Sequence, residues 1–235
     1  MVRITVVTAG FVALLGCSAI ESEDLLTSGM YADVVVSADG EGTSDVRATL
    51  RAGGALSTTF VELTGDDVLT ATLMEETVVM NEISLGNLNS FVAEFQSDEP
   101  AIDYVIALER SLDDGAPNTV IQLPAAFDID VPTVTEFARS TEDLTITWTP
   151  ADSGDNMRVT VDGDCFLLRI DELSGDPGTW TLEGGSLEDT GEESTNCEAD
   201  ITIERRKTGT LDTNYGEGGS ATGVQERTVS LQSTP

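Results

Sequence analysis

Hydrophobic and polar residues alternate along most of the chain beyond residue 28. Side chains of a β-strand point in turn to the two faces of its sheet, so this period of two predicts strands with one buried face. No long window carries the spacing of a helix. The alternation is clearest in five segments, residues 46–51, 91–95, 104–108, 144–149 and 158–161.

Pairs of glycine and aspartate separate these segments at short intervals. Glycine tolerates positive φ and aspartate bonds its own backbone, so both favour tight turns. Many short strands joined by such turns predict an all-β protein with antiparallel sheets, most often a sandwich. The turn signals are Asp39-Gly40, Gly53-Gly54, Gly65-Asp66, Asp114-Gly115, Asp162-Gly163, Gly175 to Gly178, Gly184-Gly185 and Gly218-Gly219.

The first residues have the pattern of an export signal. Arg3 precedes an uncharged, mostly apolar run over residues 4–15. This run is too short for a stable membrane span, which needs about 20 apolar residues, so we expect residues 1–16 to be a signal peptide that is cleaved off.

The tetrad Leu14-Leu15-Gly16-Cys17 resembles the lipobox of bacterial lipoproteins. The resemblance implies cleavage before Cys17 and acylation of this residue, so that Cys17 anchors the protein to a membrane. Two or three acyl chains hold a protein stably, whereas one chain holds it only marginally. Ser18 at the next position implies export to the outer membrane. Residues 17–28, polar and acidic, are expected to form a short tether.

The length of the remaining chain indicates two units. About 219 residues fit two sandwiches of about 100 residues each. An extended stretch bracketed by Pro124 and Pro132 marks the seam. We therefore expect tandem antiparallel β-sandwich domains over residues 29–131 and 132–235.

The second unit resembles the immunoglobulin and fibronectin-III class of sandwich. It reads as about seven strands, with Trp148 on an early strand and two cysteines further on. In antibody domains the tryptophan lies between the cysteines. Here it precedes both, so the resemblance implies the architecture and not the antibody core.

Cys165 and Cys197 are expected to form a disulfide. They are the two cysteines left once Cys17 carries lipid, and disulfides persist in exported proteins. The alternatives, free thiols or a metal site, lack a Cys-x-x-Cys spacing or a histidine to support them.

The composition excludes several kinds of chemistry. The chain has 43 Asp and Glu against 11 Lys and Arg, a formal net charge of −32 and no histidine. Without imidazole, Ser-His-Asp, Cys-His and His-zinc sites are excluded. Such an acidic surface repels phosphate, so we expect neither nucleic acid nor a nucleotide as partner. The sequence indicates no cofactor.

Acidic turns are the weak candidates for calcium, because calcium prefers several oxygen ligands. None matches a full calcium-loop pattern, and solvated turn residues are the favoured explanation. The candidates are Asp152, Asp155, Asp162 and Asp164, expected around one end of the second unit, and Asp39, Glu41 and Asp45 in the first.

The two tryptophans are candidates for stacking on sugar rings. Trp148 is in phase with Leu144 and Ile146, which favours a place in the core, and Trp180 is the weaker of the two core assignments. Only 5% of the residues are aromatic, which is few for a sugar-binding protein. With 43 acids, a pair of neighbouring carboxylates is no specific sign of an enzyme.

The sequence therefore predicts a non-enzymatic, lipid-anchored protein of the bacterial cell envelope. Its sandwich domains would lie near the membrane and present loops to an envelope protein or an extracellular ligand. The alternatives are a carbohydrate- or calcium-dependent binding or adhesion module and, third, a hydrolase that uses carboxylates.

Overall fold

The computed structural model describes residues 18–85, 88–130, 132, 134–191 and 195–235. These residues form strands β1 to β18 and two short 3₁₀ helices, η1 (Ser22–Asp24) and η2 (Thr27–Gly29). The protein is all-β with several open sheets, and each of the five alternating segments lies in a strand. The expectation of an all-β architecture is confirmed.

Eleven strands form one long sheet. They are β1 (Ser18–Glu21), β2 (Met30–Ala38), β3 (Ser44–Ala52), β4 (Thr59–Glu62), β7 (Asn81–Leu85), β8 (Leu88–Phe95), β12 (Glu136–Ala138), β14 (Asn156–Asp162), β15 (Arg169–Leu173), β17 (Cys197–Thr208) and β18 (Gly219–Thr234). The main path runs β1-β4-β3-β2-β18-β17-β14-β15. Beside it, β8 pairs with β3, β7 with β8, and β12 with β18.

Two smaller sheets cover this long sheet. The first has the order β10-β9-β5-β6 and the second the order β11-β13-β16. Their strands are β5 (Val68–Leu73), β6 (Glu76–Val79), β9 (Asp103–Glu109), β10 (Ala116–Gln122), β11 (Asp128–Asp130), β13 (Leu144–Thr149) and β16 (Thr179–Leu182).

Both smaller sheets pack on the same face of the long sheet. Along β18, Ala221 belongs to the first hydrophobic core and Leu231 to the second, while Val229 packs against the second. These positions differ by even numbers, and β17 and β18 pair without a register shift, so their side chains share one face. Among the described residues, no sheet covers the opposite face of the long sheet.

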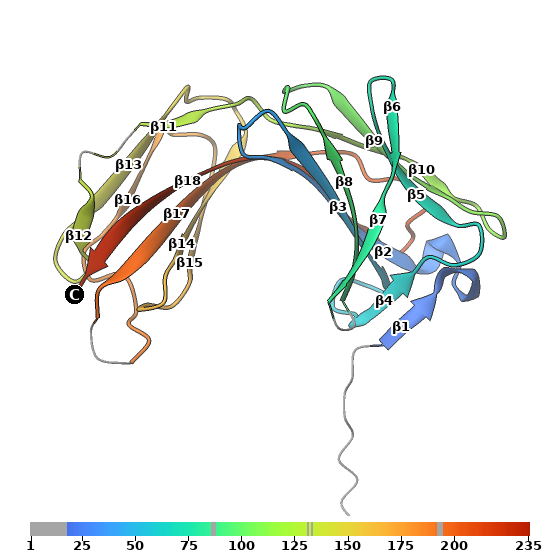
Figure 1. Cartoon of the computed structure of the whole chain (residues 1–235), viewed down its shortest axis with the longest axis horizontal. Helices are drawn as coiled ribbons and strands as arrows, with labels where there is room; N and C mark the ends of the chain where they lie inside the picture. Colours follow the sequence, from blue (N-terminus) through green and yellow to red (C-terminus); the bar gives the residue numbers. More distant parts are fainter. Residues whose placement is uncertain (1–17, 86–87, 131, 133, 192–194) are drawn as a thin grey trace, which may run out of the picture.

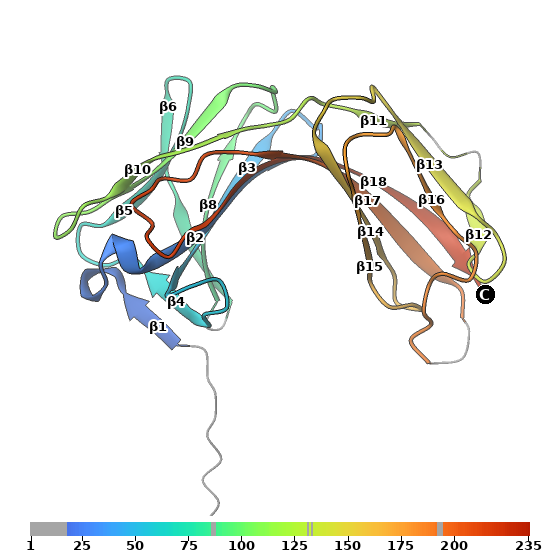
Figure 2. The same cartoon turned by 180° about the vertical axis from the view of Figure 1, so that it is seen from behind.

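The long sheet bends into an arch (Figures 1 and 2). The smaller sheets lie on the outer side of its two legs, and the paired strands β17 and β18 form the crown. β18 has 16 residues, about 50 Å of extended chain, and runs from one leg to the other.

The structure does not confirm two tandem immunoglobulin-like domains. Residues 219–225 of β18 pair in parallel with residues 32–38 of β2, so the C-terminal strand completes the first half as well as the second. Tyr215 and Ala221 likewise belong to the first core. A domain boundary at residue 131 therefore assigns most of the chain to one half or the other, but the last strand, β18, belongs to both halves.

A buried ion pair fills the joint between the two cores. Arg205 and Asp176 are both fully buried, and Nη2 of Arg205 lies 2.6 Å from Oδ2 of Asp176. The guanidinium also donates to the carbonyl oxygens of Ala125 and Pro150. The Cζ atom of Arg205 lies 4.9 Å from the ring centroid of Phe127. One side chain thus ties β17 to the segment that links the halves.

Asp176 stays ionised in this joint. Burial raises the pKa of its carboxyl, but hydrogen bonds from Trp148 and Ser153 and the charge of Arg205 outweigh burial and hold the pKa below its ordinary value. The indole of Trp148 donates to Oδ1 at 2.7 Å. The core tryptophan and the joint are therefore parts of one hydrogen-bonded unit.

The linking segment crosses β18 at a glycine. A Cβ atom on Gly223 would collide with the carbonyl oxygen of Gln122, the last residue of β10. Only glycine allows two backbones to approach this closely. The crossing brings residues 122–127 onto the crown of the arch, beside Arg205.

The predicted disulfide is confirmed. Cys165 and Cys197 are bonded with their Cα atoms 5.8 Å apart. The bond joins the loop after β14 to the first residue of β17, and these strands are neighbours in the long sheet.

Removal of the disulfide should destabilise the protein. We expect the double variant Cys165→Ala/Cys197→Ala to lose about 3 kcal/mol of unfolding free energy, because the bond restricts the unfolded chain. Urea denaturation measures the loss. The variant should be insensitive to reductant, whereas the oxidised wild type should fall to its level on reduction. Alkylation of both thiols in the untreated native protein would contradict the assignment.

Arg205 should matter far more than its neighbour Arg206. Arg205→Met leaves Asp176 as an uncompensated buried charge, and we expect a loss of about 3–5 kcal/mol. Arg206 is the control, since it lies on the open face and pairs with Glu204 at 2.6 Å with 26% of its side chain exposed. Arg206→Met should cost less than about 1 kcal/mol. Equal losses in urea denaturation would refute the role of the joint.

Candidate binding surface

The open face of the long sheet is a continuous surface to which both halves contribute. It lines the inner side of the arch in Figures 1 and 2, opposite the two cores. Register places even-numbered residues of β17 and β18 on this face, since Ile201, Ile203 and Leu231 point into the second core. The surface is therefore concave, and both legs contribute to it.

Short polar side chains form hydrogen-bonded pairs across this face. Thr202 and Thr228 lie 2.8 Å apart through their hydroxyls, and Thr49 and Ser90 lie 3.2 Å apart. The hydroxyl of Ser220 donates to Asp33 at 2.9 Å. Cross-strand pairs of this kind stabilise a sheet.

Ion pairs cross the same face. On the second half, Arg158 donates to Glu172 at 2.6 Å and lies 3.9 Å from Glu204. On the first half, Arg51 lies 3.2 Å from Asp33 and its guanidinium stands 5.7 Å from the centroid of the Tyr31 ring. These exposed pairs contribute little to stability individually, so they shape the surface more than they hold the fold.

Acidic residues crowd the crown of the concave face. Burial and the nearby charges of Glu204, Asp39 and Asp45 raise the pKa of Glu226, and Arg227 only partly opposes them. The surface is negative here because the chain supplies too few cations to neutralise it.

The N-terminal segment is docked against the first half. Arg110 is buried and pairs with Asp67 at 2.9 Å. Its guanidinium also donates to the carbonyl oxygens of Ser22 and Leu25 and to the hydroxyl of Thr27. The segment expected to be a short tether thus packs against the first half from Ser18 onward, where β1 pairs in parallel with β4.

The structure bears on the predicted calcium candidates but not on the predicted lipid site. Cys17 lies outside the described residues. Asp152 and Asp155 precede β14, whereas Asp162 and Asp164 lie at and beyond its end. A seven-residue strand, about 20 Å long, separates the two pairs, so the expectation that they surround one end is wrong.

The acidic turns of the first half also form no metal site among the described residues. Oδ1 of Asp39 accepts a hydrogen bond from the backbone of Glu41 at 3.0 Å, which is ordinary turn geometry. Within the described part of the chain, no group of three or more Cys, Asp or Glu side chains is arranged to hold a metal ion.

Both tryptophans lie in the second core. Trp148 and Trp180 are buried, and Nε1 of Trp180 donates to Asp171 at 2.9 Å. The indoles pack among core side chains, so neither presents an open face to a sugar ring.

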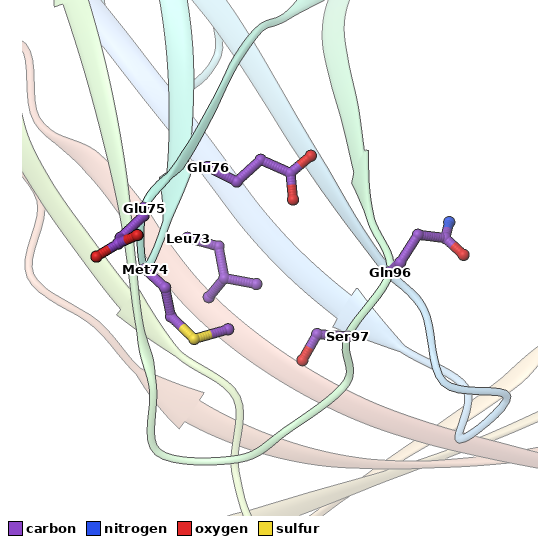
Figure 3. Close-up of a pocket in the computed structure, with 6 residues that line it drawn as sticks. All are labelled: Leu73, Met74, Glu75, Glu76, Gln96 and Ser97. Carbon is purple, nitrogen blue, oxygen red and sulfur yellow. The ribbon is translucent and has the colours of Figure 1, made fainter.

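A shallow pocket of about 470 Å³ lies beside the turn between β5 and β6 (Figure 3). Met74, Glu76, Gln96 and Ser97 are among its lining residues, and the amide of Gln96 donates to Glu94 at 2.8 Å. The pocket is open and contains none of the residues that the sequence marked as candidates.

Sequence reasoning missed the burial of Arg110 and Arg205. The sequence does carry a signal for the burial of Arg205, because this residue is in phase with the buried Ile201 and Ile203. Its partner Asp176 lies in a Gly-Asp-Pro-Gly turn that reads as solvent-exposed. Arg110 lies directly after β9, and no local pattern marks it as buried.

The comparisons with known proteins give no assignment. No family model matches the chain, and no curated protein matches it. Among the residues that the structure describes, no helix is long and apolar enough to cross a membrane.

Replacing Glu226 tests the acidic crown. Its raised pKa means that the folded state disfavours the ionised carboxyl, so stability falls as pH rises from about 4 through that pKa. Glu226→Gln should therefore raise the urea midpoint at pH 7, and the gain should vanish below about pH 4. Glu198→Gln, which removes one charge from an exposed site on the same face, is the control. Equal gains from both variants would contradict the local cause.

Proposed function

We propose that the chain is a lipid-anchored cell-envelope protein of the outer membrane with a non-enzymatic, binding or structural role. The observation that carries the proposal is where the first strand of the described residues begins. β1 starts at Ser18, the residue after the tetrad Leu14-Leu15-Gly16-Cys17, so the folded part would follow an acylated Cys17 without a gap. A protein anchored in this way has its first strand at the membrane.

The hydrogen bonds between Arg110 and the N-terminal segment support a folded part that lies close to the membrane. A flexible tether would let the domains move away from the bilayer, but Ser22 and Thr27 are buried and held by the guanidinium of Arg110. Consecutive Cα atoms are about 3.8 Å apart, so acyl chains on Cys17 would enter the bilayer directly beside β1. The fold would then be held in one orientation.

The concave face supports a binding role. It is broad, polar and continuous over both legs of the arch, and its side chains are ordered by cross-strand hydrogen bonds such as that between Thr202 and Thr228. We regard each leg as an immunoglobulin-like sandwich that shares β18 with the other. The partner would be a protein of the envelope or an extracellular ligand, and the negative charge around Glu226 favours one with a basic surface.

Acylation of Cys17 is the direct test. The wild type, exported from a bacterial host, should start at Cys17 and carry the mass of its acyl chains, because the thioether needs the sulfur. Cys17→Ser should remain unacylated and move from the detergent phase to the aqueous phase. Intact-mass spectrometry and phase partitioning measure the two results.

The disulfide variant Cys165→Ala/Cys197→Ala provides the control. It also loses cysteines but should keep its lipid and remain in the detergent phase. A wild-type protein with an unmodified Cys17, or one that begins at another residue, would overturn the proposed function.

A further inference from the structure

One end of the long sheet carries exposed aliphatic side chains beside the first strand. Ser18 pairs with Thr59, and Leu56 lies three residues before Thr59 in the loop that leads into β4. The side chain of Leu56 is 97% exposed. Leu88 and Ile83, in the neighbouring hairpin of β7 and β8, are exposed as well.

The other end of the same sheet carries a matching set. Leu167, Leu168 and Ile170 are exposed where the chain passes from the disulfide into β15. Ile170 pairs with Thr160, close to the end of β14. The two ends together hold six of the eleven large hydrophobic side chains that are exposed among the described residues.

The arch brings these two ends to the same side of the molecule. In Figures 1 and 2 the beginnings of β1 and β4 lie at the foot of one leg, and the beginning of β17 lies at the foot of the other. The turn between β5 and β6 lies on the opposite side. A flat surface that meets one foot would therefore also meet the second.

We propose that the arch stands on a lipid bilayer with both feet, inserting Leu56 and Leu88 at one foot and Leu167 and Leu168 at the other. This inference rests on the proposed function, since the acyl chains on Cys17 bring the bilayer to the first foot. The second foot docks because the sheet between the two feet is continuous and its crown is fixed by Arg205.

At the first foot, the local charge fits this occupant. Residues 52–61, which include Leu56, carry no charge in a chain with 43 acids. An uncharged loop can approach lipid headgroups without the repulsion that the rest of the surface would meet at an anionic membrane. Each buried aliphatic side chain then adds apolar contact to that of the acyl chains.

Tryptophan quenching tests the two contacts. The single variants Leu56→Trp and Leu168→Trp are prepared in the acylated protein and reconstituted into phosphatidylcholine vesicles with brominated acyl chains. Bromine quenches an indole only at close range, and Trp148 and Trp180 are buried and give a constant background. We expect both variants to lose the added emission relative to vesicles without bromine.

Met74→Trp is the matched control. Met74 is 64% exposed and lies in the turn between β5 and β6, on the side away from the feet. Its added emission should be unchanged by bromine. Quenching of Leu56→Trp alone, of no variant or of all three would overturn the inference. The inference would also be overturned if both feet contacted an envelope protein and bromine quenched neither of the two added tryptophans.

A second form of the protein separates this inference from the proposed function. The mature chain with Cys17→Ser and an N-terminal histidine tag is held on vesicles that contain nickel-chelating lipid, and the same three variants are measured. If the wild type proves unacylated, the proposed function fails, while quenching at both feet of the tagged protein still supports the docking. If the wild type is acylated and the second foot is not quenched, only the inference fails.

Discussion

The pairing of β18 with both β17 and β2 is the constraint on which the rest of the structure depends. Through it, residues from the two ends of the chain lie in one sheet, and the last 16-residue strand belongs to both halves. Backbone hydrogen bonds across a central strand cannot be broken on one side without exposing unpaired groups. The two legs of the arch are therefore coupled by backbone pairing rather than by a loose linker.

Polar groups are buried at the crown because β18 is shared by the two halves. A single sheet with two cores on one face must have an interval between them, and here Arg205 and Asp176 fill it. A buried ion pair is by itself weak evidence for stability, and its geometry is defined by the hydrogen bonds that its other polar groups make. Ala125, Pro150 and Trp148 take part in three such bonds, while Nε of Arg205 has no partner among the described residues. The shape of the arch is thus specified by polar contacts and not by apolar packing alone.

The same geometry decides what the surface can do. Because both smaller sheets cover one face, the other face is left as a concave polar surface, and the ends of the strands form two feet. Arg110 holds the N-terminal segment that follows β1 against the first half. A lipid on Cys17, one residue before β1, would therefore set the orientation of the whole arch relative to a bilayer. The concave face and the position of both strand ends on one side of the molecule are consequences of one sheet topology.

The sequence by itself determined the local structure. Alternation placed Val46, Ala48 and Leu50 on a buried face, and the parity of the cysteines predicted the bond between Cys165 and Cys197. Only the tertiary structure decided which strands are neighbours, because backbone hydrogen bonds are identical for every sequence and a parallel pairing over 187 residues, as between Asp33 and Ser220, leaves no local signal. For the same reason the burial of Arg110 and Arg205 depends on partners that the chain brings together only when it folds.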